Sequence, residues 1–257
     1  MWANSTLDTE DRGYLYDAAL NLNVRTNNGV TSTFGVDSKN QLTTIPGGSC
    51  LYDMNSNLTS DPSRTFSYDD ENQLTQVIYP NSTRVDLTYD GRSRLRKRTE
   101  YTWNGSSWNL AGEFRYIYDG MRVIQKRDGS NNPTVAYTRG TDLSGSLEGA
   151  GGIGGLLARS HGYSGGSWTT HHFYHADAGG NITAMVDNSQ AISANYRYEP
   201  FGSLISSSGS MSGVNTYRFS SKEWLLNANL YFTTAIASMT RICRGGQIGI
   251  RSTNLVE

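Results

Sequence analysis

Tyr68-Asp69-Asp70-Glu71-Asn72-Gln73-Leu74 is the stretch from which the fold can be predicted, because its spacing returns along most of the chain. An aromatic residue precedes an aspartate, and an aliphatic residue follows five positions after it. Recurrence of this kind indicates an array of supersecondary units. The units with this spacing are Tyr16-Asp17 with Leu22, Val36-Asp37 with Leu42, Tyr52-Asp53 with Leu58, Tyr68-Asp69 with Leu74, Tyr89-Asp90 with Leu95, and Tyr118-Asp119 with Ile124.

Two later units keep the spacing with altered residues. Asp177 is followed by Ile182, but Ala176 stands where the tyrosine is expected and Tyr174 lies two residues earlier. Tyr198-Glu199 is followed by Leu204 and has glutamate in place of aspartate. The sequence therefore contains eight units at irregular intervals.

Each unit predicts a strand, a turn and a second strand. An aspartate side chain can accept hydrogen bonds from backbone N–H groups two or three residues further on, so it begins the turn. The tyrosine ends one strand and the aliphatic residue begins the next, which lets both pack on the same layer. Leu20 and Ser56 stand where glycine would ease the turn. The predicted fold class is all-β, with repeated antiparallel hairpins forming part of a spiralling shell.

Bulk composition agrees with many short, half-buried strands. The chain has 257 residues, 16 tyrosines, 28 glycines, 5 prolines and a mean hydropathy of -0.53. Its net charge of -1 gives no general attraction to nucleic acid or to an anionic membrane. Two cysteines define no disulfide framework, and no window approaches the ~20 apolar residues of a membrane helix. We expect no nucleic-acid partner, no membrane segment and no export signal within this chain.

The clearest hairpin is predicted from Leu74–Tyr79 and Arg84–Tyr89, which alternate apolar and polar residues around Pro80-Asn81-Ser82. The segment Arg92 to Tyr101 is expected to return as a strand with its basic residues on the solvent side. These basic residues could instead form a nucleic-acid patch, but acidic neighbours favour a solvated strand face. Further turns at residues 103–108 and 128–132 predict a continuing antiparallel meander.

Residues 141–155 are rich in glycine and mark the best internal boundary. No Lys-Ser/Thr pair follows the glycines to complete a P-loop, and no dinucleotide-binding context surrounds them. We therefore predict a structural role, in which backbones approach closely where the chain crosses from one layer to another.

No catalytic, cofactor or metal residue is predicted. His171 and His175 share one face of a strand about 13 Å apart, and His172 points the opposite way, so one metal ion could not bind all three. Aspartates that recur with the turn spacing are predicted to be structural, because the sequence places no carboxylate pair across a cleft. Ser160 and Ser210 lack a nucleophile elbow.

The repeated Tyr-Asp units resemble the YD repeats of RHS (rearrangement hotspot) proteins. A second set of segments resembles the RHS repeat-associated core domain: residues 152–157, 172–177, Asn181-Ile182-Thr183, Tyr196-Arg197-Tyr198-Glu199-Pro200-Phe201-Gly202 and 218–223. The resemblance implies YD repeats over residues 10–140 and the core domain over residues 150–232. It also implies a large secreted or cell-surface protein whose repeats spiral into a hollow β shell around a C-terminal toxin. The expected partners are upstream RHS repeats and that toxin domain.

In many members of that family the core domain plugs one end of the shell and cleaves its own chain by aspartyl chemistry at an Asp-Pro motif. Residues 233–257 depart from the family, since they contain no Asp-Pro pair. Suitable codons for Thr233 to Val256, read from the third base, restore a Tyr- and Arg-rich segment with two Asp-Pro pairs. We hypothesise that a frameshift or a sequencing error produced a poorly packed tail.

The leading interpretation is therefore a noncatalytic structural fragment of an RHS-type polymorphic toxin. One alternative is a surface adhesion or carbohydrate-binding β protein that contacts glycans through exposed tyrosine and tryptophan. Another is a self-cleaving domain, which would require the intact tail.

Overall fold

A computed structural model describes residues 11–232, 240–243 and 246–249. As the composition predicts, the described chain is mostly β structure. It also contains two short 3₁₀ helices. Its strands are β1 (Arg12–Tyr16), β2 (Leu22–Asn27), β3 (Val30–Thr33), β4 (Gly35–Val36), β5 (Leu42–Ile45), β6 (Gly48–Ser49), β7 (Leu51–Tyr52), β8 (Leu58–Asp61), β9 (Arg64–Tyr68), β10 (Leu74–Tyr79), β11 (Thr83–Tyr89), β12 (Leu95–Trp103), β13 (Trp108–Asp119), β14 (Arg122–Asp128), β15 (Pro133–Arg139), β16 (Leu156–Ser164), β17 (Ser167–Ala176), β18 (Ile182–Asp187), β19 (Ile192–Tyr198), β20 (Leu204–Ser208), β21 (Glu223–Leu225), β22 (Leu230–Phe232), β23 (Thr240–Cys243) and β24 (Gly246–Gly249). The 3₁₀ helices are η1 (Phe219–Ser221) and η2 (Leu226–Ala228).

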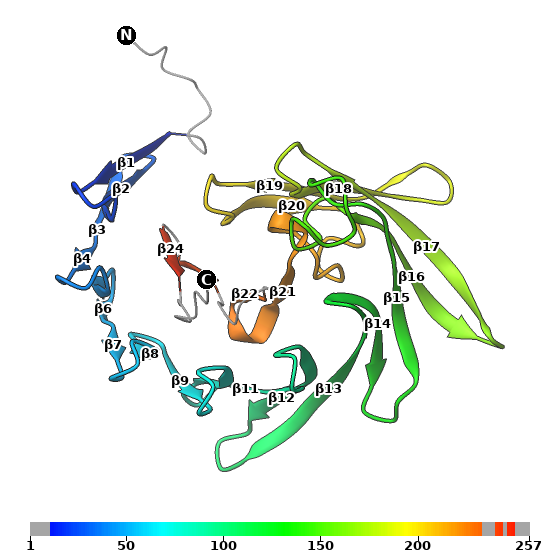
Figure 1. The fold of residues 1–257 in the computed structure, drawn as a ribbon, viewed down its shortest axis with the longest axis horizontal. Helices are drawn as coiled ribbons and strands as arrows, with labels where there is room; N and C mark the ends of the chain where they lie inside the picture. Colours follow the sequence, from blue (N-terminus) through cyan, green and yellow to red (C-terminus); the bar gives the residue numbers. More distant parts are fainter. Residues whose placement is uncertain (1–10, 233–239, 244–245, 250–257) are drawn as a thin grey trace, which may run out of the picture.

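One long antiparallel meander makes up most of the molecule. Strands β7 to β20 form a 14-stranded sheet in which every strand pairs with its sequence neighbours. The predicted hairpin of β10 and β11 is confirmed, with Tyr79 opposite Thr83. Two three-stranded sheets, β1 to β3 and β4 to β6, continue the same curve (Figure 1). We call strands β1 to β20 the wall.

The wall curves because a register irregularity recurs at the same place in the units. A β-bulge bends its strand and increases the local twist, so repeated bulges curl a sheet in one direction. The irregularity falls beside the pair of residues that flank the turn, at Tyr16 with Leu22, Val36 with Leu42, Tyr52 with Leu58, Tyr68 with Leu74, Tyr89 with Leu95, Ala176 with Ile182 and Tyr198 with Leu204.

The hydrophobic core lies between the inner face of the wall and a segment that folds back inside it. Residues 211–232 lie inside the curve of the sheet in Figure 1, and we call this segment the plug. On the wall Val77, Val85 and Ile182 are fully buried, and on the plug Leu225 and Leu230 are fully buried. Neither surface could exclude water alone, so wall and plug stabilise each other.

The two ends of the wall meet. Both oxygens of the Glu199 carboxylate accept hydrogen bonds of 2.7 Å from Arg25 on β2. Arg12 on β1 forms a further ion pair with Glu199 at 3.2 Å. Tyr14 packs edge-to-face on Phe201, with ring centroids 5.2 Å apart. The wall is therefore closed around the plug by side chains where no backbone ladder joins β1 to β20.

The prediction that the chain changes layer at residues 141–155 is wrong. Strands β15 and β16 flank this segment and are neighbours in the same sheet, with Thr138 opposite Ala158. The predicted close approach of backbones is confirmed, because the Gly140 N–H donates to the Gly155 carbonyl at 2.8 Å. A Cβ on Gly180 would lie 2.9 Å from the backbone nitrogen of Gly154.

Two further expectations need correction. Arg98, expected on the solvent side of its strand, is 4% exposed, because it lies opposite Leu87 on the inner face of the wall. The unit at Tyr118 has a shorter turn than predicted, since Asp119 pairs directly with Arg122. As a result Val123, and not Ile124, pairs with Tyr118 and is buried.

Beyond β22, strands β23 and β24 extend the small sheet of the plug, with Thr240 opposite Tyr231. The prediction of poor packing over residues 233–257 concerns side chains outside the described residues. Within the described chain, no helix has the length and apolar character needed to cross a membrane.

Candidate functional site: the repeat turns and the plug

The repeated aspartate organises the turn of its unit. The Asp69 N–H donates to the Gln73 carbonyl at 3.0 Å, and the Asn72 N–H donates to the Asp69 carbonyl at 3.0 Å. The Asp69 Oδ1 atom accepts the N–H groups of Glu71 at 3.0 Å and Gln73 at 2.8 Å. The same four contacts occur at Asp17, Asp37, Asp53, Asp90 and Asp177, and also at Asp187, which is not one of the eight predicted units.

The third residue after each of these aspartates has a left-handed backbone conformation. Asn72 and Gly180 suit this conformation, with φ of 60° and 74°. Leu20, at φ 64°, and Ser56, at φ 68°, adopt it as well, at the two positions where the sequence suggested a less favourable turn.

The repeated tyrosine joins one unit to the preceding one. Its hydroxyl donates to the backbone carbonyl of the aliphatic residue in the preceding unit. The bonds are Tyr52 to Leu42 at 3.0 Å, Tyr68 to Leu58 at 3.0 Å, Tyr89 to Leu74 at 2.9 Å, Tyr118 to Leu95 at 2.9 Å and Tyr198 to Ile182 at 2.8 Å. Burial raises the pKa of Tyr68, Tyr89, Tyr118 and Tyr198, so these hydroxyls stay protonated as donors. We call this set the tyrosine ladder.

Units near the C-terminal end of the wall contact the plug or the opposite end. Asn181 donates from Nδ2 to Asp177 Oδ2 at 2.9 Å and accepts the Ser220 N–H at 2.8 Å through Oδ1. The Glu199 turn follows β19. In this turn Phe201, which comes directly after Pro200, packs on Tyr14. Gly202 has a left-handed backbone conformation, with a φ of 84°. The Asp119 carboxylate is largely exposed and pairs with Arg122.

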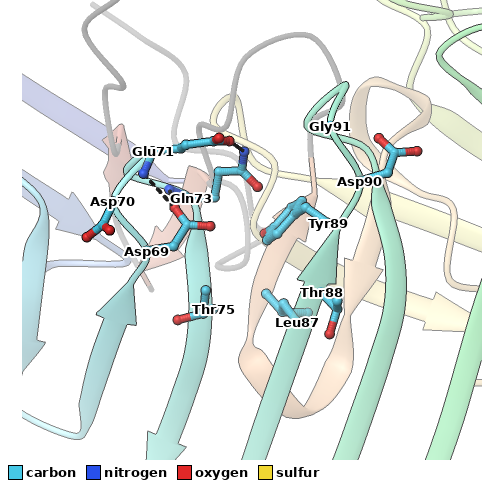
Figure 2. Close-up of a pocket in the computed structure, with 10 residues that line it drawn as sticks. All are labelled: Asp69, Asp70, Glu71, Gln73, Thr75, Leu87, Thr88, Tyr89, Asp90 and Gly91. Atoms are coloured by element: carbon cyan, nitrogen blue, oxygen red, sulfur yellow. Dashed lines mark hydrogen bonds between the residues drawn. The ribbon is translucent and has the colours of Figure 1, made fainter.

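An open groove of about 460 Å³ lies between the turns at Asp69 and Asp90, over the Tyr89 ring. Figure 2 shows Asp69 directed back into its own turn and Asp90 on the other side of Tyr89. Asp90 accepts the N–H groups of Arg92 and Arg94 and the Arg94 side chain at 2.9 Å. Both turn aspartates are therefore used structurally, and this groove does not present them as an acid–base pair.

The plug is attached to the wall by a buried charge cluster around Glu223, at the start of β21. Glu223 Oε1 accepts from Lys126 Nζ on β14 at 2.9 Å and from Thr216 Oγ1 at 3.3 Å, and Arg98 Nη1 on β12 lies 3.5 Å away. Burial alone would raise the pKa of Glu223, but Lys126 and Arg98 outweigh it and lower the pKa. Glu223 is therefore an anion inside the shell.

Further contacts join other parts of the plug to the wall. Arg64 on β9 is 1% exposed, forms an ion pair with Asp61 at 2.7 Å and donates to the Ala228 carbonyl at 2.7 Å. The Asn227 Nδ2 group donates to Glu100 on β12 at 2.7 Å. These bonds fix η2 against the first half of the wall.

The second half of the wall contacts the plug through neutral groups. Tyr174 on β17 donates to Asn215 Oδ1 at 2.8 Å, and Asn215 Nδ2 donates to the Tyr196 hydroxyl at 3.3 Å. Tyr174 therefore belongs to the plug junction and does not take the place of the tyrosine missing at position 176. The Ile182 N–H donates to the Arg218 carbonyl at 3.1 Å.

The histidines face opposite sides of the wall, as strand alternation predicts. His171 pairs with Ser160 at 2.8 Å on one face, and His172 pairs with Ser193 at 2.9 Å on the other, where it stacks on His161. Among the described residues no group of histidine, cysteine and acidic side chains could hold a metal ion.

Sequence reasoning did not identify Arg98, Lys126 and Glu223 as a cluster. The available signal was a charged residue at an inward position of an alternating strand, since Arg98 falls in register with Leu87. A partner from another part of the chain was needed to interpret it, and the sequence alone did not supply one.

Comparisons with solved structures show the fold. The chain aligns with TcdB2–TccC3 with a TM-score of 0.65 and 15% identity, covering 90% of this chain and 12% of that chain. It aligns with the Photorhabdus luminescens Tc holotoxin pore with a TM-score of 0.61 and 15% identity, over 89% of this chain and 11% of that one. The wall is thus part of a spiralling β shell of the kind found in these toxin structures.

Sequence comparison finds relatives among large nucleases. The chain is 29% identical over 212 residues to the tRNA3(Ser)-specific nuclease WapA of Bacillus spizizenii and 29% identical over 209 residues to the tRNA nuclease WapA of Bacillus subtilis. Each alignment covers 80% of this chain, and the chain spans about 8% of the length of these curated relatives. No family model matches the chain.

Proposed function

We propose that this chain is a structural, noncatalytic part of an RHS-type toxin carrier, in which YD repeats form the wall and the core domain forms the plug. The observation that supports the proposal most directly is the plug itself, held inside a closed turn of wall by the ion pairs of Glu223. The likeness to the Tc toxin structures and to WapA is consistent with this role. The proposed domains are residues 10–140 for the repeats and 150–232 for the core.

In the complete carrier the shell would enclose a C-terminal toxin outside the producing cell, after upstream RHS repeats. We test this by expressing the whole gene and digesting the purified product with protease under native conditions. We expect enclosed polypeptide to survive, and we expect Glu223→Gln, which weakens the plug, to expose it. The control is Glu71→Gln, at an exposed turn residue. Equal digestion of all three proteins would contradict a carrier role.

The proposed absence of catalysis is tested with tRNA. The purified chain should not cleave tRNA above the buffer background, because this chain matches only a small part of its relatives and its repeated aspartates are used in turns. Cleavage that disappears in a single point variant would show that the chain is itself a nuclease.

A second candidate, glycan contact, has one specific observation in its favour. Aromatic pairs lie at the ends of two hairpins, Trp103 with Trp108 at 5.1 Å and Tyr163 with Trp168 at 5.0 Å. Glycan-array binding that is lost on Trp168→Ala would support this function. Binding to none of the glycans would leave the pairs as cross-strand contacts that stabilise the hairpins.

We also propose that the tail after Phe232 departs from the family because of a frameshift or a sequencing error. Sequencing the gene across the codons for Leu230 to Thr234 tests this. A shifted frame without the two Asp-Pro pairs would remove the idea.

A further inference from the structure

A small cavity beside the plug contains two cations with no paired acid. Its volume is about 30 Å³, and its lining includes Arg139, Lys222, Tyr217, Gly151 and Phe232. Arg122 and Glu223 also line it, and both are already paired, with Asp119 and with Lys126. A cavity needs a volume of ~10–15 Å³ to hold one water molecule, so this cavity can hold more than one group of that size. It lies where the wall strand β15 ends and where the plug strand β22 ends.

Both cations retain free donors. Lys222 Nζ donates one hydrogen bond to the Gly151 carbonyl at 2.6 Å, out of the three that an ammonium can make. Arg139 donates from Nε to the Val123 carbonyl at 3.1 Å, and its guanidinium lies over the Tyr217 ring at 4.9 Å. Among the described residues neither cation forms an ion pair with a carboxylate.

The neighbouring acids are already engaged. Glu223 accepts from Lys126 and Thr216. Asp142 uses Oδ1 to accept the Ser144 hydroxyl at 2.6 Å, and Oδ2 to accept the N–H groups of Ala150 at 2.7 Å and Gly152 at 3.0 Å. Burial, and next the charge of Arg139, lower the pKa of Lys222 to about 8, although Asp142 opposes this.

We propose that this cavity binds a carboxylate, held between the Lys222 ammonium and the Arg139 guanidinium. A carboxylate matches the planar fork of a guanidinium and neutralises two partly buried like charges at once. The rings of Tyr217 and Phe232 give an apolar side that would accept the carbon chain of the acid. The inference rests on the cavity and not on the proposed carrier function. The carboxylate could come from a free small acid or from an acidic side chain of a polypeptide.

The experiment measures how fast Lys222 reacts with a limiting amine-reactive N-hydroxysuccinimide ester at pH 8, followed by peptide mass mapping. The chain has three other lysines, Lys39, Lys97 and Lys126, so all four sites can be distinguished. Acetate is compared with chloride at equal ionic strength. Lys222, with a pKa of about 8, is about half neutral at pH 8, and a pKa rise of one unit leaves about a tenth of it neutral. We therefore expect acetate at saturation to slow Lys222 labelling by about fivefold and to leave Lys39 unchanged.

Two peptides identify the source of the carboxylate. Blocked Gly-Asp-Gly should protect Lys222 at lower concentration than acetate if the site accepts a polypeptide side chain, and blocked Gly-Asn-Gly should not protect it. Protection by acetate alone would assign the site to small free acids. If none of the carboxylates protects Lys222 more than chloride does, the proposal is wrong.

A variant pair locates the effect. Arg139→Gln should abolish protection by acetate, and Arg127→Gln on the neighbouring strand should retain it. Circular dichroism checks that both variants fold. If a variant does not fold, the comparison of acetate with chloride on the wild-type protein still tests the proposal. Full protection in folded Arg139→Gln would overturn the assignment of the site.

Discussion

At the scale of single residues, the repeated sequence pattern must meet two separate requirements for its turn to form. The aspartate supplies acceptors for the N–H groups inside the turn, and the third residue after it must accept a left-handed backbone. Five different residue types meet the second requirement in the units described above, because the aspartate contacts hold the conformation: Leu20, Asn40, Ser56, Asn72, Ser93, Gly180 and Gln190.

Leucine is the least suitable of these residues, so Leu20→Gly should stabilise the protein. A left-handed conformation costs a residue with a Cβ ~1–2 kcal/mol, while glycine loses ~0.5–1 kcal/mol in chain entropy. Leu20 is 81% exposed, so little burial is lost. We expect the free energy of unfolding to rise by about 0.5 kcal/mol in urea titration. Asn131→Gly, at φ 67°, is the control and should change it less, since asparagine already tolerates this conformation. A loss of stability in Leu20→Gly would contradict the argument.

Asp142 predicts part of the acid sensitivity. The Ser144 hydroxyl, with the N–H groups of Gly152 and Ala150, lowers the pKa of Asp142 to about 2 against the opposing effect of burial. A carboxyl with a lowered folded-state pKa stabilises the protein fully above its unfolded pKa of ~3.9, and this stabilisation is lost as the pH falls toward 2.

Urea titrations between pH 5 and pH 2.5 check this expectation. Stability should fall with pH in the wild type and fall less steeply in Asp142→Asn. Part of the slope should remain, because Asp17, Asp90 and Asp128 also have lowered pKa values. Asp119→Asn, at an exposed carboxyl, is the control. Identical slopes for wild type and Asp142→Asn would show that Asp142 does not contribute.

At the scale of elements, five units are tied to the preceding unit by one tyrosine hydroxyl each. The Tyr68 hydroxyl reaches the Leu58 carbonyl at 3.0 Å, and Tyr68 itself pairs with Leu74 at the register irregularity on its other side. This explains why tyrosine, and not phenylalanine, recurs beside the aspartate, even though burial of the ring is similar for both.

Tyr68→Phe should therefore destabilise the protein by about 1 kcal/mol, the typical net value of a hydrogen bond, with an added cost if the Leu58 carbonyl stays unpaired. The measurement is the free energy of unfolding by urea. Tyr16→Phe is the matched control, because Tyr16 is 46% exposed and its hydroxyl donates no ladder bond, so its effect should stay within ~0.5 kcal/mol. Equal effects of the two substitutions would argue against the ladder.

At the scale of the whole molecule, the plug and the closure of the wall depend on charges that are far apart in sequence. Lys126 reaches Glu223 across 97 residues, and Arg25 reaches Glu199 across 174. Buried ion pairs add little net stability, but removing one partner leaves an uncompensated charge inside the protein.

Lys126→Met should accordingly cost about 3–5 kcal/mol, because Glu223 is left with weaker compensation from Arg98. The double variant Lys126→Met with Glu223→Gln should recover part of this loss, which a double-mutant cycle measures. Lys97→Met, on β12 of the same sheet, is the control. Additive effects of the two single substitutions would show that the pair does not couple plug and wall.

The sequence by itself determined the turn-forming aspartates, the hairpins and the all-β class, because these depend on contacts within a few residues and on strand alternation. It also indicated which turns are unfavourable, at Leu20 and Ser56. Only the tertiary structure decided that Arg98 faces inward, that the tyrosine hydroxyls join successive units, and that Arg139 and Lys222 share a cavity. Each of these depends on a partner brought close by the curvature of the wall, and local sequence patterns do not contain that curvature.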